Sequence, residues 1–427
     1  MSRFHTLADW LTWQDSLHPS KIDLGLERVV AVARRLEVLQ PGYRVVTVAG
    51  TNGKGSSVAL LEAIYRSAGY RTGSYTSPHL LRYNERIRID GREVDDAALC
   101  AAFERVDQAR DGVSLTYFEF GTLAALLLFD TAGLDIALLE VGMGGRLDAV
   151  NIIDADVALV TSIGIDHSAW LGNDRETIGR EKAGIFRAGR PAVCSDPSPP
   201  TSLRQHAAGI GAHCYALGVD FTRTRAGQHW NWRGWHAAHD ALPLPALAGE
   251  WQLDNAAGVL AVVDLLDAHL PVSRDALEQA LRTVRLAGRF QVFPGMPQVI
   301  LDVAHNPDSA GMLSRQLRAS PVAGRTWLVL GMLVDKDVAA FAAALDGCID
   351  CWCLAGLAVT RGLPAEVLAQ RIAMPGKHRE IRLFDTVTAA LAQALELAAP
   401  ADRIVVSGSF ITVGEALASP YFPPAAR

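Results

Sequence analysis

Long apolar segments are absent from this chain of 427 residues. No run reaches the ~18 consecutive apolar residues that a membrane-spanning helix needs. The N-terminal segment MSRFHTLADWLTWQD carries Asp9 and Asp15 where a signal peptide has an uninterrupted apolar core. We therefore expect no membrane association and a cytoplasmic location.

Cysteine is scarce, with six residues in the chain. This number is too small for a disulfide scaffold in a protein of this length, so we expect reduced thiols. Cys348, Cys351 and Cys353 lie close together in GCIDCWCLAG, but no second Cys or His cluster nearby completes a set of four zinc ligands. We interpret them as compact core residues on a strand, with a metal site as the alternative.

Net positive charge is also lacking, because the formal charge is −6. Nucleic acid is a poor partner for such a chain, and we expect none to bind. An anionic ligand would need a local cluster of basic residues to overcome the overall charge.

Hydrophobic residues make up half of the chain, which at this length allows two or three domains with buried cores. From residue 45 to about 195, strand-like segments (VVTVAG, LDIALLEVG, DVALVTSIGID, RPAVCS) alternate with helical ones, including a helix from about Asp174. This alternation predicts a largely parallel sheet with helices on both faces. Residues 196–247 read as less regular, and Trp230, Trp232 and Trp235 in HWNWRGW favour a small packed sheet over a stacking surface for a ligand.

The alternation starts afresh after LAGRFQVFPGMPQ, with QVILDVAH, RTWLVLGML, DCWCLA, REIRLFD and DRIVVSGSF as strand-like segments. A second α/β unit of normal domain size is therefore expected. We place the boundary between residues 1–287 and residues 288–427. A cleft between two α/β domains, at the carboxyl ends of strands, is a favoured place for substrates.

The segment VAGTNGKGSS resembles a phosphate loop but departs from the strict Walker A pattern, because Val48 stands where the first Gly belongs and Gly55 follows Lys54. Its three glycines still allow backbone N–H groups to converge on an anion, and Lys54 supplies a positive charge. A strand precedes it and a helix follows, so the helix N-terminus would face the anion. Ser56 and Ser57 are placed either to cap that helix or to reach a metal.

Polar residues follow the other predicted strands: Ser77, Glu140 and the pair Asp166-His167. In a parallel sheet these residues share one edge with the phosphate loop, and such a mixed set of oxygen and nitrogen donors suits Mg²⁺. Taken singly, a structural His or a solvated Glu is the plain alternative, and the shared edge favours a site. Lys182, in REKAGIFRAG, would be awkward beside a metal unless it pairs with phosphate or is carbamylated; a solvated helix lysine is the other reading.

Ordered blocks along nearly the whole chain resemble one family. These blocks are GTNGKGS, YTSPHLLRYNERI, LEVGMGGRLDAVN, SIGIDHSAWLG, REKAGI, LAGRFQ, DVAHNP, GMLVDKD and GSFITVG. They are similar to those of folylpolyglutamate synthases and dihydrofolate synthases, within the Mur ligase superfamily. The opening WQDSLHPSKIDLGLERV is similar to the bifunctional proteobacterial members. The resemblance implies an α/β fold with a Mur-ligase-like P-loop ATPase domain and a smaller Rossmann-like C-terminal domain, and the departure from Walker A is normal for this family.

The resemblance also implies roles for individual residues. The matching nucleotide and phosphate contacts are Thr51, Asn52, Gly53, Lys54, Asn255, Arg289 and Asp302. The matching metal ligands or their neighbours are Ser56, Ser77, Glu140, His167 and Lys182, of which Lys182 matches a lysine that is carbamylated in relatives; Lys54, Lys182 and His167 are the expected catalytic residues. The matching pterin pocket is Asp23, Leu24, Gly25, Thr116, Tyr117, Phe118, Glu119, Leu147 and Asp148, and His305 and Ser409 resemble residues near the incoming glutamate.

The implied reaction is ATP-dependent ligation of L-glutamate to dihydropteroate and to reduced folates through an acyl phosphate. ATP, Mg²⁺, as two ions, and a carbamylated Lys182 are the implied cofactors, and a monomer is expected. Alternatives are a synthase that only elongates folates, another Mur-type amide ligase, or a nucleotide switch or kinase. A switch or kinase would leave the second α/β domain and Lys182 unexplained.

Overall fold

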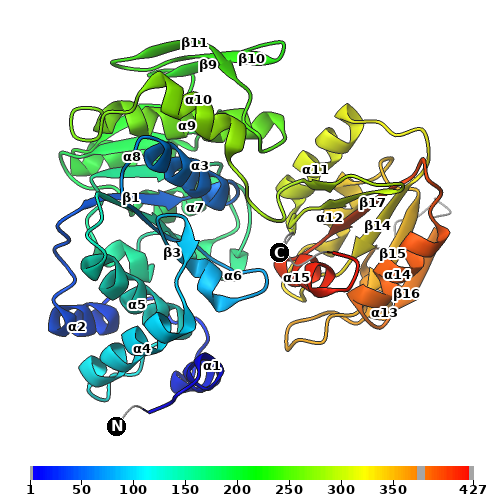
Figure 1. Cartoon of the computed structure of the whole chain (residues 1–427), viewed down its shortest axis with the longest axis horizontal. Coiled ribbons are helices and arrows are strands. Elements are labelled where there is room, and N and C mark those ends of the chain that lie inside the picture. The colour runs from blue at the N-terminus through cyan, green and yellow to red at the C-terminus, as the bar shows by residue number, and fades with distance from the viewer. Residues whose placement is uncertain (1–2, 373–379, 423–427) are drawn as a thin grey trace.

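The computed structural model describes residues 3–372 and 380–422. It consists of two sheet-centred bodies, coloured blue to green and yellow to red in Figure 1. The N-terminal body is built on an eight-stranded sheet in the order β4-β3-β2-β5-β1-β6-β7-β8, parallel from β2 to β8 and closed at one edge by the antiparallel β3 and β4. Its strands are β1 Arg44–Ala49, β2 Thr72–Tyr75, β3 Ile87–Ile89, β4 Arg92–Glu93, β5 Ile136–Glu140, β6 Val157–Val160, β7 Pro191–Cys194 and β8 His213–Ala216.

The central strands are almost entirely buried and mostly apolar because both faces of the sheet are covered. In β1, Val45 and Ala49 contribute to one core cluster, whereas Val46 and Val48 contribute to the other. Successive side chains of a strand point to opposite faces, so a strand buried on both sides has no polar face to show.

Helices cover the two faces. One core contains residues from α1 Leu7–Leu17, α2 Glu27–Leu36, α4 Asp96–Arg110, α5 Tyr117–Thr131, α7 Arg175–Ala183 and α8 Thr201–Ile210. The other contains residues from α3 Lys54–Ser67, α9 Glu250–Leu266 and α10 Arg274–Thr283. The short elements η1 Tyr83–Arg86, η2 Ala149–Ile152 and α6 Ser168–Leu171 lie in the connections that follow strands. The predicted parallel sheet with helices on both faces is confirmed.

Residues 196–247, predicted as a less regular stretch with a small sheet, also contain a helix and a parallel strand that the prediction did not include. This stretch forms α8, then β8, which extends the parallel sheet beside β7, and then a three-stranded antiparallel sheet of β9 Thr222–Ala226, β10 His229–Arg233 and β11 Ala238–Pro243, at the top of Figure 1. Each element is short and lies between turn-forming residues, so its periodicity covers too few residues to stand out.

Two of the three tryptophans pack this small sheet, as predicted. Trp230 and Trp232 are two residues apart on β10, are fully buried, and donate their Nε1–H groups to the carbonyls of Pro243 at 2.9 Å and Ala257 at 3.0 Å. Trp235 lies beyond the strand and is 62% exposed.

The C-terminal body is a six-stranded sheet in the order β12-β13-β17-β14-β15-β16, parallel except for β12 at one edge. Its strands are β12 Gln291–Phe293, β13 Gln298–Leu301, β14 Thr326–Leu330, β15 Cys351–Ala355, β16 Glu380–Phe384 and β17 Arg403–Ser407. Its helices are α11 Pro307–Ala319, α12 Val338–Ala344, α13 Ala365–Ile372, α14 Val387–Leu397 and α15 Phe410–Ala418. Cys351 and Cys353 are buried on β15, which confirms their interpretation as core residues. For Cys348 the interpretation is wrong, because this residue lies in a turn before the strand and is only half-buried.

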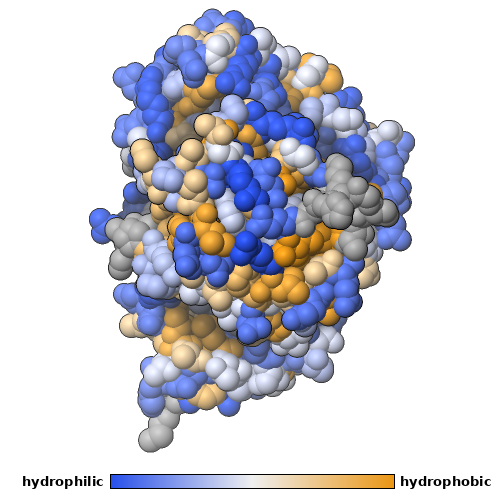
Figure 2. Space-filling view, turned by 90° about the vertical axis from the view of Figure 1, so that its right-hand side faces the viewer, coloured by the Kyte–Doolittle hydropathy of each residue, from blue (hydrophilic) through white to orange (hydrophobic). Residues whose placement is uncertain are grey.

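The outer side of the C-terminal body mixes hydrophilic and hydrophobic residues, as Figure 2 shows. At the sheet edge, Ile381 and Leu383 of β16 are 39% and 45% exposed. Over the described ranges, none of the helices combines the length and the apolar character that crossing a membrane would require.

Candidate active site

A cavity of about 1120 Å³ is lined by residues of both bodies. Ser57 is fully buried and does not line this cavity, but every residue to which the family resemblance gave a role does. These residues are Asp23, Leu24, Gly25, Thr51, Asn52, Gly53, Lys54, Ser56, Ser77, Thr116, Tyr117, Phe118, Glu119, Glu140, Leu147, Asp148, His167, Lys182, Asn255, Arg289, Asp302, His305 and Ser409. Segments from residue 23 to residue 409 thus converge on one space.

Four neighbouring strands deliver the polar centre of this cavity. In the order β2-β5-β1-β6, their carboxyl ends lead to Ser77, Glu140, the phosphate loop and His167. The predicted common edge is therefore present. Parallel strands produce it directly, because all their carboxyl ends lie on the same side of the sheet.

The phosphate loop runs from the end of β1 into α3. Gly53 is the N-cap residue with φ 94°, a left-handed conformation that favours glycine, and it makes no side-chain cap. A Cβ at this position would lie 2.4 Å from Oδ1 of Asn255, so Asn255 packs directly on the loop. The alternative that Ser56 caps the helix is wrong, because α3 begins at Lys54 and Ser56 is buried in its first turn, where its hydroxyl accepts from Nε2 of Gln252 at 3.3 Å.

Two lysines meet at one carbonyl oxygen. Nζ of Lys54 donates to the carbonyl of Gly50 at 3.0 Å, and Nζ of Lys182 donates to the same oxygen at 2.9 Å. Lys182 lies in the last turn of α7 and is only 4% exposed, so the reading as a solvated helix lysine is wrong. Burial, with the nearby charge of Lys54, lowers the pKa of Lys182 to about 7. This end of the cavity is electropositive and suits phosphate oxygens.

Glu140 is a buried carboxylate beside the phosphate loop. Its Oε2 accepts from the backbone N–H of Ser77 at 3.1 Å, and burial raises its pKa while the charge of Lys54 opposes the rise. Burial lowers the pKa of His167 to about 4, which leaves the neutral imidazole that metals bind.

The donor set fits Mg²⁺ bound mainly through other oxygens. No group of three His, Cys, Asp or Glu residues in the described part of the chain could hold a metal ion by itself. Mg²⁺ usually takes one or two protein carboxylates and completes its octahedron with waters and substrate phosphates. Glu140 beside the phosphate loop meets that requirement.

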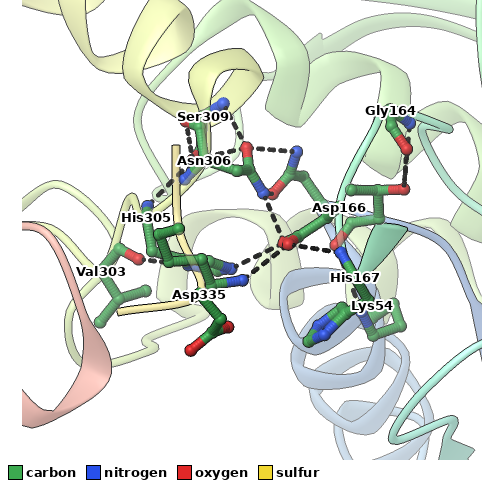
Figure 3. Close-up of polar contacts among 12 residues, drawn as sticks. Lys54, Gly164, Asp166, His167, Val303, His305, Asn306, Ser309 and Asp335 are labelled. Atoms are coloured by element: carbon green, nitrogen blue, oxygen red, sulfur yellow. Dashed lines mark hydrogen bonds and ion pairs between the residues drawn. The ribbon is translucent and has the colours of Figure 1, made fainter. Parts of the chain in front are cut away.

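Asp166, which the sequence placed with His167 at the shared edge of the strands, is a junction between the two bodies. Its carboxylate faces several donors: Nζ of Lys336 at 2.6 Å, Nδ2 of Asn306 at 3.1 Å, Nε2 of His305 at 3.3 Å and the backbone N–H of His167 at 2.8 Å. Figure 3 shows Asn306, His305 and His167 around it. Burial alone would raise the pKa of Asp166, but the hydrogen bond from His305 and the charge of Lys336 hold it well below its usual range.

The phosphate loop is tied to the C-terminal body by a pair of amides. Nδ2 of Asn306 donates to Oδ1 of Asn52 at 3.1 Å, and Nδ2 of Asn52 donates back at 3.4 Å. Asn306 also caps α11. Asp166 and Lys336 stand in the quoted blocks SIGIDHSAWLG and GMLVDKD, but their pairing could not be read from blocks 170 positions apart.

Several candidate residues of the C-terminal side have structural contacts as well. Asp302 accepts from the backbone N–H groups of Phe290 and Ala304, both at 2.8 Å, and Ser409 caps α15. The guanidinium of Arg289 lies 5.0 Å from the ring centre of Phe410.

The part of the cavity wall that contains Asp23 and Glu119 is held in place by side-chain contacts. Asp23 accepts from NH1 of Arg28 at 2.8 Å and contacts Nε2 of His18 at 3.1 Å. NH2 of Arg28 also donates to Glu119 at 3.2 Å, and Glu119 forms a capping box with Thr116 at the start of α5. Glu119 therefore orders the wall as well as lining it.

Asp148 is buried in this wall, with 4% of its surface exposed. Its carboxylate accepts from the backbone N–H groups of Met143 at 2.8 Å and Val150 at 3.1 Å. Burial raises its pKa from 3.8 to about 7 in spite of these hydrogen bonds.

The raised pKa of Asp148 predicts a pH-dependent stability. The unfolded carboxyl ionises near its ordinary pKa and the folded one near 7, so unfolding releases a proton between these values and folded stability declines as the pH rises through that window. Asp148→Asn cannot ionise, so its stability should not show this decline. The difference in free energy of unfolding, variant minus parent, should therefore increase by up to about 4 kcal/mol between about pH 4 and pH 8. Denaturant unfolding over this range measures it, with the exposed Asp130→Asn as control; a difference that stays flat with pH would contradict the assignment.

The architecture and the site agree with known domain families. The Mur ligase middle domain matches residues 48–263, and the glutamate ligase domain of Mur ligases matches residues 288–410. The chain is therefore an ATP-dependent ligase of the Mur type. It is 46% identical over 411 residues to the dihydrofolate synthase/folylpolyglutamate synthase of Escherichia coli K12, covering 96% of this chain and 94% of the relative. The chain belongs to the dihydrofolate synthase/folylpolyglutamate synthase family.

Solved structures of this family have the same fold. Escherichia coli FolC in complex with DHPP and ADP superposes with a TM-score of 0.92 at 45% identity, covering 97% of both chains. A bifunctional folylpolyglutamate synthase/dihydrofolate synthase with Mn, AMPPNP and L-glutamate bound gives a TM-score of 0.90 at 46% identity, covering 97% of this chain and 98% of that one.

Proposed function

We propose that this chain ligates L-glutamate to dihydropteroate, which gives dihydrofolate, and to reduced folates, which gives folylpolyglutamates. The observation that carries the proposal is the convergence of the phosphate loop, the buried Glu140 and the Tyr117–Phe118 wall on one cavity between the two bodies. The relatives support it, since one is described with DHPP and ADP and another with Mn, AMPPNP and L-glutamate.

The chemistry proceeds by activating a carboxylate. An oxygen of the acceptor's carboxylate attacks the γ-phosphorus of ATP, ADP leaves, and an acyl phosphate forms; the amine of glutamate then attacks the acyl carbon and expels inorganic phosphate. Lys54 stabilises the charge on the phosphoryl oxygens, as electrostatic stabilisation dominates phosphoryl transfer. The cavity walls from both bodies align the reactants and keep water from the acyl phosphate.

Individual residues take the roles that the family resemblance implies. Thr51, Asn52, Gly53, Lys54, Asn255, Arg289 and Asp302 bind the nucleotide. Asp23, Leu24, Gly25, Thr116, Tyr117, Phe118, Glu119, Leu147 and Asp148 bind the pterin substrate, and His305 and Ser409 lie near the glutamate. The proposal keeps the domain boundary between residues 287 and 288, a cytoplasmic location and a monomer.

Mg²⁺, as two ions, is the proposed metal, with Ser56, Ser77, Glu140, His167 and a carbamylated Lys182 as its ligands or neighbours. When bound, it neutralises charge on the phosphate oxygens. Carbamylation requires the neutral amine: Nζ attacks the carbon of CO₂, a C–N bond forms, a C=O π pair moves to oxygen, and the nitrogen loses a proton to solvent. Burial of Lys182, whose pKa lies at about 7, supplies the neutral amine.

Product analysis tests the function. Purified protein is incubated with Mg-ATP, glutamate and either dihydropteroate or tetrahydrofolate, and the product masses are read. We expect one glutamate added to each acceptor and ADP formed only when acceptor and glutamate are both present. ADP release that needs neither would favour a nucleotide switch, and extension of tetrahydrofolate alone would favour a synthase that only elongates folates.

Asp148→Ala should separate the two reactions. Because Asp148 belongs to the proposed pterin pocket, we expect its loss to raise the KM for dihydropteroate by roughly 10- to 100-fold and to affect folate elongation less. Steady-state kinetics with both acceptors measures this, with Asp130→Ala as the exposed control. Equal losses in the two assays would count against the assignment.

A further inference from the structure

Arg86 is a cavity residue to which neither the motifs nor the family resemblance gave a role. It ends η1 and lines the cavity together with His79 and Tyr117. Its Nε donates to Nδ1 of His79 at 2.8 Å, and its guanidinium carbon lies 5.4 Å from the ring centre of Tyr83 and 5.6 Å from that of Tyr117. The side chain is thus fixed on three sides before any ligand arrives.

The groups that fix Arg86 are all uncharged. Burial, together with the charge of Arg86, lowers the pKa of His79 to about 4, so its imidazole is neutral at physiological pH, and both tyrosines keep their phenol protons. The adjacent Glu85 is occupied elsewhere, because its carboxylate accepts from the backbone N–H groups of Leu80, Leu81 and Arg82 at 2.7, 2.6 and 2.6 Å.

Two other cavity cations have a carboxylate partner, whereas Lys54, Lys182 and Arg289 donate to backbone carbonyls. Lys336 pairs with Asp166 at 2.6 Å, and Arg175 pairs with Asp196 at 2.9 Å. For Arg86, the described residues provide only the imidazole and the two rings. Glu140 feels the charge of Arg86, but no carboxylate of the described residues forms an ion pair with it. A half-buried cation without a paired carboxylate is costly, and a fixed one is prepared to receive an anion.

The position of Arg86 indicates which anion. Tyr117 places it against the wall proposed for the pterin substrate, and the charge of Arg86 is felt by Glu140 at the phosphate end. It lies between the part of the cavity that would hold the body of the acceptor and the part where its carboxylate reacts. Because Nε is engaged with His79, the two terminal nitrogens remain to bind a carboxylate in the paired geometry that arginine favours.

We propose that Arg86, oriented by His79, is the binding site for a glutamate α-carboxylate. Two sources share this chemistry: the terminal glutamyl residue of a folate acceptor, and the free glutamate. Dihydropteroate carries neither, since its one carboxylate is the reacting group. The inference rests on the proposed function, and it makes Arg86 a residue that serves glutamylated acceptors or glutamate itself, but not the pteroate skeleton.

Arg86→Gln tests this against Arg86→Lys and the control Arg82→Gln. Arg82 neighbours the site on the chain but pairs with Asp96 at 3.1 Å and lies outside the cavity lining. KM and kcat are measured for dihydropteroate, tetrahydrofolate and glutamate. For Arg86→Gln we expect one KM, that for tetrahydrofolate or that for glutamate, to rise roughly 10- to 100-fold while kcat changes little, with partial recovery in Arg86→Lys.

The arms distinguish the two sources. A raised KM for tetrahydrofolate alone assigns the site to the glutamyl residue of the acceptor, and a raised KM for glutamate with both acceptors assigns it to the free amino acid. A rise for dihydropteroate equal to that for tetrahydrofolate, or no change in any KM, would overturn the proposal. If the parent enzyme itself ligates neither acceptor, the proposed function has failed instead.

A substrate analogue gives a second measurement that does not depend on how the variant folds. If the acceptor supplies the carboxylate that Arg86 binds, a tetrahydrofolate whose α-carboxylate is a carboxamide should bind the parent enzyme as weakly as tetrahydrofolate binds Arg86→Gln. If free glutamate supplies it, the same comparison is made with glutamate and its α-amide. The amide should make no further difference in Arg86→Gln; an additional loss there would place the carboxylate on another residue.

Discussion

Lys54→Ala is expected to abolish both ligation activities, with a loss of roughly 1,000-fold or more in kcat. Nζ of Lys54 already lies within the phosphate loop, held by the carbonyls of Gly50 at 3.0 Å and Thr51 at 3.3 Å. Both reactions pass through the same phosphoryl transfer, whichever acceptor is bound. Removing the charge should therefore affect both to the same extent.

The measurement is the rate of product formation with each acceptor, together with thermal unfolding to show that the variant is folded. Arg66→Ala is the matched control, because it removes an exposed cation from the far end of the same helix, α3. Turnover within a few-fold of the parent in either assay would refute the phosphate-loop assignment.

Much of the N-terminal body could be predicted because its strands are central and apolar on both faces. β1 and β5 are buried on both sides, so each is a mostly hydrophobic run between turn residues. The edge of the sheet was harder to predict. β8 is short, and its outer position leaves His213 exposed and Cys214 and Tyr215 half-buried, so the strand lacks a clear hydrophobic pattern. That difference explains why β8 was not predicted as a strand of the large sheet.

Within the site, a residue could be predicted when its own strand determines its position. Ser77, Glu140 and His167 each follow a strand, so the sheet alone brings them to one edge. Ion pairs across the cavity have no such signal. Asp166 meets Lys336 because the C-terminal body docks against the N-terminal one, and nothing in either segment specifies that approach.

The burial of a charged side chain could not be predicted from the sequence either. Lys182 belongs to a polar nine-residue helix, and composition alone suggests an exposed side chain. The helix instead packs so that its last turn faces the phosphate loop, and Lys182 reaches the carbonyl of Gly50 at 2.9 Å. Only the fold shows that two lysines share this oxygen.

Lys182→Ala is expected to lose activity by roughly 100-fold or more, whether the native group is an ammonium that contacts phosphate or a carbamate that binds metal. Loss of activity alone does not separate the two. The chemistry of the replaced group does, because a carbamate ends in a negative carboxylate-like group and an ammonium in a positive one.

Chemical rescue of Lys182→Ala uses that difference in charge. The cavity left by the side chain lies beside Gly50 of the phosphate loop and is open to small solutes through the active site. If the native group is a carbamate, short-chain carboxylates such as acetate should restore part of the activity of Lys182→Ala, and small amines should not. Lys54→Ala is the control: the group that it removes is proposed to be an ammonium, so carboxylates should not restore its activity. Recovery with amines alone would overturn the carbamate, as would electron density for Lys182 that ends in a bare amine in crystals grown near neutral pH with bicarbonate, Mg²⁺ and nucleotide. Because a carbamate nitrogen keeps one N–H, the hydrogen bond to Gly50 can survive the modification, so the contact seen here is compatible with either form and the rescue decides between them.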